Sequence, residues 1–157
     1  MKILKTGAIC VLACLCYVHA AAQQNQQPAV TEKSDYVKPR IFADLPQKLQ
    51  LNVSMLEGML NDEVGEKVHF ALGHGYQFQG VVVSKSDAGD KHTRTVVVKA
   101  TNRQGVTFTF TRNTNADGTY SYLGRMLSFK HGDAFEITEE SGKLLMVKKD
   151  QQDLFEE

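Results

Sequence analysis

The chain has 157 residues, with 18 Lys+Arg and 18 Asp+Glu, so its formal net charge is zero. A chain without a basic excess lacks the electrostatic footprint that nucleic acids and anionic lipids attract, and we expect neither as a partner. Its length fits one export segment followed by one domain that can bury its own core without disulfides.

The first 22 residues have the three-part pattern of a secretory signal peptide. Lys2 and Lys5 give a positive start, residues 6–18 carry no acidic or basic side chain, and Ala20 to Ala22 are suited to cleavage before Gln23. The apolar run of about 12 residues is shorter than the stretch of about 20 that a membrane span needs. We therefore predict that residues 1–22 are a signal peptide and that the protein is exported, to the periplasm or the extracellular space.

All three cysteines lie in this segment, at Cys10, Cys14 and Cys16. Cleavage before Gln23 would leave a chain with no thiol, no disulfide and no Cys-ligated metal. It would also remove two lysines and no acid, leaving 16 Lys+Arg against 18 Asp+Glu, a formal charge of −2. The alternative is a lipoprotein, because residues 11–14 resemble a bacterial lipobox. A membrane contact is expected only in that case, through a lipid on Cys14 or Cys16.

Residues 23–40 are rich in glutamine and poor in apolar side chains, which predicts a disordered tether. A β-rich domain is expected over residues 41–150. Within it, residues 48–53 alternate as a short strand, and Ser54 followed by Glu57 matches a capping box. We therefore predict a short helix from Met55 to Asn61.

From Lys67 onward the hydrophobic period is two and it repeats seven times. The clearest case is residues 106–111, where Val106, Phe108 and Phe110 alternate with threonines. Short connections rich in Gly, Asn and Asp separate the runs, with no helix-length segment between them. The predicted fold is mainly β, an antiparallel meander of about seven strands that forms a sandwich or a small barrel, followed by a polar C-terminal tail over residues 151–157.

The apolar phase slips at one point, around Gly124. Tyr120 and Tyr122 share one parity, whereas Leu123 and Leu127 have the other. A glycine at such a slip predicts a β-bulge or a sharp bend, at which one strand could turn the corner between two sheets.

No catalytic motif stands out in the sequence. No GxSxG, HExxH or glycine-rich phosphate loop is present, and we predict a protein that is not an enzyme and has no cofactor and no metal. Residues 113–118 (NTNADG) resemble the opening of a calcium loop. Position 12 of that loop would be Gly124 in place of a glutamate, and the Asp-Gly pair is more simply a hairpin turn.

A speculative binding cluster is formed by Tyr120, Tyr122 and Arg125, because aromatic and guanidinium groups are enriched at binding hot spots. The alternative is that these residues belong to the β-core, with the arginine reaching outward.

Three functions stay open. The first is an exported, non-catalytic module that binds a protein or another component of the cell envelope. The second is a small carrier of an apolar ligand, with a pocket lined by Phe108, Phe110, Tyr120 and Tyr122. The third is an enzyme whose site is assembled across strands.

Overall fold

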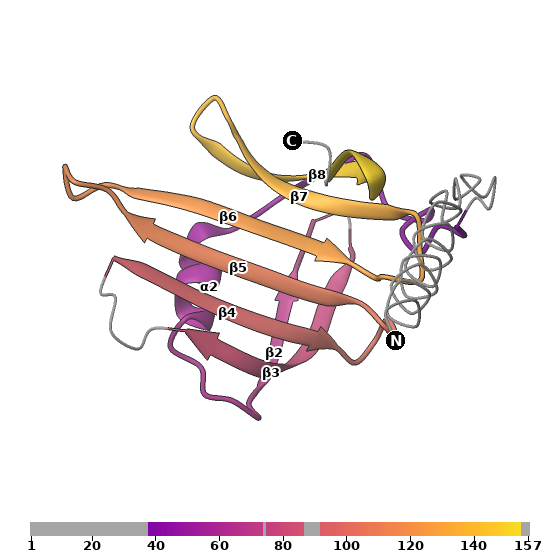
Figure 1. The fold of residues 1–157 in the computed structure, drawn as a ribbon, viewed down its shortest axis with the longest axis horizontal. Helices are drawn as coiled ribbons and strands as arrows, with labels where there is room; N and C mark the ends of the chain where they lie inside the picture. The colour runs from indigo at the N-terminus through magenta and orange to yellow at the C-terminus, as the bar shows by residue number, and fades with distance from the viewer. Residues whose placement is uncertain (1–37, 74, 87–91, 155–157) are drawn as a thin grey trace, which may run out of the picture. The chain divides into compact units, whose positions relative to one another are not determined.

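The computed structural model describes residues 38–73, 75–86 and 92–154 (Figure 1). The predicted signal peptide, most of the predicted tether and residues 155–157 lie outside the described residues. In chain order the described elements are β1 (Lys48–Gln50), α2 (Val53–Met59), β2 (Lys67–Ala71), β3 (Gln77–Ser86), β4 (Thr93–Ala100), β5 (Thr107–Thr114), β6 (Tyr120–Leu127), β7 (Asp133–Glu140), β8 (Lys143–Asp150) and the 3-10 turn η2 (Gln152–Leu154).

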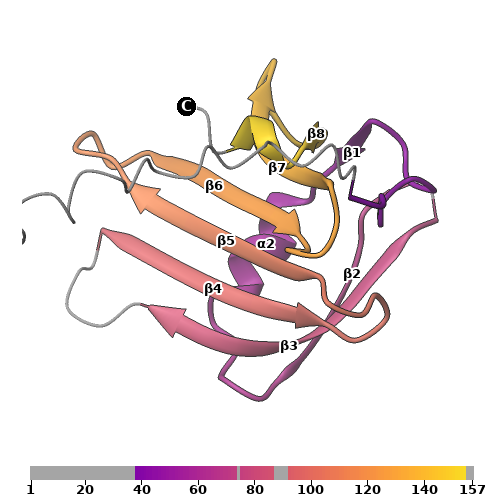
Figure 2. The same ribbon diagram turned by 45° about the vertical axis from the view of Figure 1, so that its right-hand side comes forward.

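The eight strands form one sheet in the order β1-β8-β7-β6-β5-β4-β3-β2, and every neighbouring pair is antiparallel. The predicted mainly β, antiparallel architecture is therefore confirmed. The sheet curls into a half-barrel, with α2 against its inner side (Figures 1 and 2). A single open sheet thus takes the place of the two-sheet sandwich and of the closed barrel.

The alternating sequence gives the sheet two different faces. The core face carries Phe108 and Phe110, both fully buried, whereas the outer face carries the half-buried Thr107, Thr109 and Thr111. The ring of Phe78 lies 4.8 Å from that of Phe70 and 5.8 Å from that of Phe108, measured between centroids. Such aromatic pairs add to the free energy gained by burying apolar area, which is the main force holding a sheet of this kind together.

The helix begins earlier than predicted. Its N-cap is Asn52, whose Oδ1 accepts a hydrogen bond from the Met55 backbone N–H at 3.3 Å, and α2 spans Val53–Met59. The predicted cap at Ser54 is wrong. Asn52 is as good an N-cap as serine, and the Glu57 side chain is engaged by the sheet, so it does not complete a capping box.

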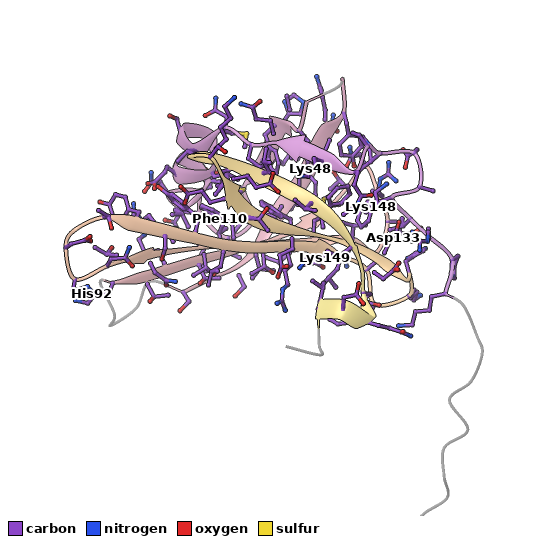
Figure 3. The ribbon with its side chains drawn as sticks, turned by 90° about the horizontal axis from the view of Figure 1, so that it is seen from above. Lys48, His92, Phe110, Asp133, Lys148 and Lys149 are labelled. Atoms are coloured by element: carbon purple, nitrogen blue, oxygen red, sulfur yellow. The ribbon has the colours of Figure 1, made fainter. Side chains whose placement is uncertain are left out.

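Polar side chains fasten the segment before β1 to the sheet. Asp133 at the start of β7 is fully buried, and its carboxylate accepts hydrogen bonds from the Ile41 N–H at 2.7 Å and the Phe42 N–H at 2.8 Å. The Lys148 ammonium donates to the carbonyls of Phe42 and Leu45. Asp133 and Lys148 lie at the end of the domain where the described chain begins (Figure 3).

The sheet is not evenly paired, and the irregularity lies between β6 and β7. All eight residues of β6 pair with β5, from Thr114↔Tyr120 to Thr107↔Leu127. Only three residues of β6, Arg125 to Leu127, pair with β7. Figure 1 shows β7 beside β6 near their connecting turn and then leaving it to form a hairpin with β8.

Gly124 stands where the two strands separate. The β5–β6 register runs through Gly124 without a slip, so the predicted bulge is not there; the described register shift lies in β3, between Val82 and Ser84. A Cβ atom on Gly124 would lie 2.6 Å from Ile137 Cδ1 and 2.7 Å from the Thr109 carbonyl oxygen. The glycine therefore lets the Ile137 side chain of β7 lie against β6 at the point of divergence.

Candidate functional site

The first half of β6 presents an unpaired edge in the interior of the sheet. Over residues 120–124 the strand pairs with β5 on one side, and no described strand pairs with it on the other. An unpaired edge offers a row of main-chain donors and acceptors to which an extended chain can bind. We call residues Tyr120 to Leu123 the β6 edge.

The direction of the main-chain groups on the β6 edge follows from one hydrogen bond in the neighbouring strand. The Thr114 N–H donates to the His92 carbonyl, so Thr114 turns its main-chain groups away from β6. In an antiparallel pair the residue opposite, Tyr120, then turns its own groups away from β5, and the alternation repeats every second residue. Tyr120 and Tyr122 therefore point their N–H and C=O groups toward the open side.

The side chains of the β6 edge carry no charge, and two of them are well exposed. Leu123 on the outer face is 58% exposed, and Tyr120 on the core face is 49% exposed. Natural sheet edges are commonly protected by charged residues or by being very short. The two outer edges of this sheet follow that rule, because β2 carries Lys67 and β1 has only three residues. The β6 edge has neither protection.

A polar cluster on the core face holds the two tyrosines in place. The Glu57 carboxylate of α2 accepts a hydrogen bond from the Tyr122 hydroxyl at 2.8 Å and an ion-paired bond from Arg112 Nη1 at 2.7 Å. The Arg112 guanidinium carbon lies 4.4 Å from the centre of the Tyr120 ring, a cation–π contact. The Tyr122 ring stacks on Phe110 with centroids 5.8 Å apart. Both rings are thus held by contacts within the chain.

The structure brings together two of the three predicted binding residues. Tyr120 and Tyr122 share the core face, whereas Arg125 has the opposite parity and lies on the outer face. There its guanidinium is 3.2 Å from Glu136, which Lys149 also contacts at 2.8 Å. Burial by itself would raise the pKa of the Glu136 carboxyl. The two cations outweigh burial and hold this pKa below its usual range. The sequence reading missed Arg112 and Glu57, which take the place expected of Arg125.

The other candidate chemistry is accounted for by local structure. Asp117 Oδ1 accepts hydrogen bonds from the N–H and hydroxyl of Thr119 within the predicted hairpin turn. His131 Nδ1 lies 2.8 Å from Ser128 Oγ, but that serine is fully buried and out of reach of a substrate. Among the residues that the structure describes, no group of three His, Cys, Asp or Glu side chains is placed to hold a metal ion.

Two shallow hollows of about 420 and 430 Å³ lie away from the β6 edge. One is at the β2–β3 pair, lined in part by Lys67 and Gln79, and the other is near the end of β8, lined in part by Arg40 and Asp150. Of the four aromatic residues expected to line a carrier pocket, Phe108 and Phe110 are packed in the core with no exposed surface, whereas Tyr120 is 49% exposed on the β6 edge.

No protein-family model, curated protein or solved structure matches this chain. Within the described part of the chain, no helix has the length and apolar character needed to cross a membrane.

The Tyr122 hydroxyl should make stability depend on alkaline pH. Burial and the hydrogen bond to Glu57 raise the pKa of Tyr122 to about 12, against roughly 10 in an unfolded chain. A group whose pKa is raised on folding stabilises the native state below the unfolded pKa, and this contribution is lost as the pH rises toward the folded pKa. We expect the urea midpoint to fall between pH 10 and 12 by more in the native chain than in Tyr122→Phe. An equal fall in both would contradict the raised pKa of Tyr122.

Proposed function

We propose that this protein is an exported, non-catalytic module that binds an extended segment of another protein by adding it as a strand to the β6 edge. The observation that carries the proposal is the unequal pairing of β6, with eight residue pairs to β5 and three to β7. The export part rests on the signal-peptide pattern of residues 1–22.

Strand addition suits this edge for three physical reasons. Main-chain hydrogen bonds supply affinity without requiring one particular sequence. The main-chain N–H and C=O groups of Tyr120 and Tyr122 are directed toward the open side, where they can form such bonds. The rings are already held by Arg112 and Glu57, so little conformational entropy is lost there on binding. The exposed Leu123 and Tyr120 side chains would gain contact area from the partner.

The edge can be tested in the free protein by amide hydrogen exchange of the full chain. We expect the Tyr120 and Tyr122 amides to exchange quickly, because they face the open side. The Ser121 and Leu123 amides should exchange slowly, because they are directed toward β5. This alternation within one strand supplies its own control. Equal protection of all four amides would show that another part of the chain covers the edge, and would overturn the proposal.

Binding itself can be tested by selecting random displayed peptides on the full chain. We expect the selected peptides to slow exchange at Tyr120 and Tyr122. Leu123→Lys puts a charge beside the open edge and should weaken binding at least about tenfold. The matched control is Val83→Lys. Val83 is a similarly exposed apolar residue (46%) at the bulge of β3, and this variant should bind the selected peptides as tightly as the native chain does. Peptides that bind equally well to Leu123→Lys would refute the β6 edge as the site.

A further inference from the structure

The surroundings of the β6 edge also indicate which segment it takes. Given the proposed strand addition, on which this inference rests, we infer that the bound segment places an apolar side chain directly opposite Tyr122, on the core face. The polarity of the two residues that flank it matters less, because their side chains point to the outer face.

The position opposite Tyr122 is defined by the geometry of antiparallel pairs. Directly opposed residues send their side chains to the same face, so the ligand side chain opposite Tyr122 must point toward the core face. On one side it meets the Tyr122 ring, which packs on the buried core. Toward the closed end the space is bounded by Gly124, against which the buried Ile137 side chain lies.

Helix α2 lies on the core face of the sheet, beneath this position (Figure 1). Glu57 contacts the Tyr122 hydroxyl, and Val53 lies four residues before Glu57 on the same helix face. Val53 is 37% exposed, one of the few large apolar side chains of the described chain that stay accessible. Ile137 is only 5% exposed, so the apolar surface offered to the ligand side chain is mainly that of Tyr122 and Val53.

A charged side chain would find no accessible counter-ion among the described residues at this position, because Arg112 Nε, which has no hydrogen-bond partner, is buried. The Glu57 carboxylate is already occupied by Arg112 and by the Tyr122 hydroxyl, with contacts of 2.7 and 2.8 Å. An acidic side chain would be placed near this carboxylate, and a basic one would have to compete with Arg112 for it. Desolvating a charge without a partner is costly, whereas burying a branched or aromatic side chain is favourable. The site therefore selects Val, Leu, Ile or Phe over Asp, Lys or Gly.

The test is a set of blocked peptides of sequence Lys-Thr-Thr-X-Thr-Thr-Lys, titrated into the full chain up to millimolar concentration and followed by NMR shifts of the Tyr120–Leu123 amides. With X as Val, Leu or Phe we expect binding at least about tenfold tighter than with Gly or Asp, as burial of one such side chain allows. A control peptide methylated on the nitrogen of X loses the main-chain bond to Tyr122 and should bind weakly whatever X is.

A variant of the protein tests the contribution of Val53 and should leave α2 intact. Val53→Asp adds an acid to the first turn of α2, where a negative charge is favourable, so the fold should be kept. We expect it to abolish the preference for Val, Leu and Phe, so that the peptides with X as Val and X as Gly bind with similar affinity. Val64→Asp, at a more exposed loop position (60%), is the matched control and should keep the preference.

The possible failures are distinguishable. If every peptide binds equally and N-methylation abolishes binding, strand addition stands and the inferred preference is wrong. If the N-methylated peptides bind as well as their parents, or if no peptide shifts the Tyr120–Leu123 amides, the proposed function is wrong and the inference falls with it.

Discussion

Asp133→Ala should lower the free energy of unfolding by about 3 kcal/mol, the largest effect that we expect from one side chain. The Asp133 carboxylate is fully buried and is the hydrogen-bond acceptor for the Ile41 and Phe42 N–H groups, at 2.7 and 2.8 Å. Removing it leaves two donors without an acceptor, and hydrogen bonds to a charged group are stronger than neutral ones. The Phe42 ring, which packs edge-on against Phe135 with centroids 5.3 Å apart, should loosen with the segment.

The measurement is urea unfolding, combined with exchange of the Ile41 and Phe42 amides. The control is Asp153→Ala, which removes an exposed aspartate in the nearby η2 turn and should change stability by less than about 0.5 kcal/mol. If Asp133→Ala costs less than about 1 kcal/mol, or if the two amides keep their protection, the carboxylate does not fasten this segment.

The strands were predictable because their pattern is set by local physics. Alternation places one face of each strand in the core, and in residues 107–111 the phenylalanines are buried while the threonines are not. The hairpin at Asp117 and Gly118 was predictable for a similar reason. Gly118 has a positive φ of 84°, which glycine adopts without strain.

The first residue of α2 depends on whether Asn52 or Ser54 is the N-cap, and the local sequence does not decide between them. Asn52 and Ser54 are both good N-caps, and Ser54 had the added signal of Glu57 three residues on. In the structure Glu57 binds Arg112 and Tyr122, residues 55 and 65 positions further along the chain. A pairing over such a distance leaves no local signal in the sequence.

Part of the candidate site could have been found from parity. Tyr120 and Tyr122 are even-numbered and Arg125 is odd, so an unbroken strand places them on opposite faces, as the structure does. Arg112 shares the parity of Phe108 and Phe110. A charged residue at a core-facing position needs a partner. The parity of Arg112 was therefore the sign in the sequence that a buried ion pair is present. The open β6 edge had only a weak sign in the sequence, the phase slip at Gly124. How far β6 pairs with β7 depends on contacts between the two strands, and the hydrophobic pattern of β6 alone does not contain them.

Gly124→Ala should destabilise the protein by about 2 kcal/mol, because overfilling a tightly packed site typically costs 1 to 3 kcal/mol. The added Cβ would lie 2.6 Å from Ile137 Cδ1 and 2.7 Å from the Thr109 carbonyl oxygen. The first contact can be relieved, because a side-chain end can move. The second cannot, because Thr109 is paired within the sheet. Ile137→Val in the same chain should therefore recover only part of the loss.

Gly58→Ala is the matched control, and it should have the opposite sign. Nothing lies within 4 Å of a Cβ at Gly58, inside α2, and alanine favours a helix over glycine by about 1 kcal/mol. Urea unfolding of both variants and of the double variant measures the difference. If Gly124→Ala is as stable as the native chain, β7 is free to move away from β6. The unequal pairing that leaves the β6 edge open would then be adjustable, and not fixed by the packing of Ile137 on Gly124.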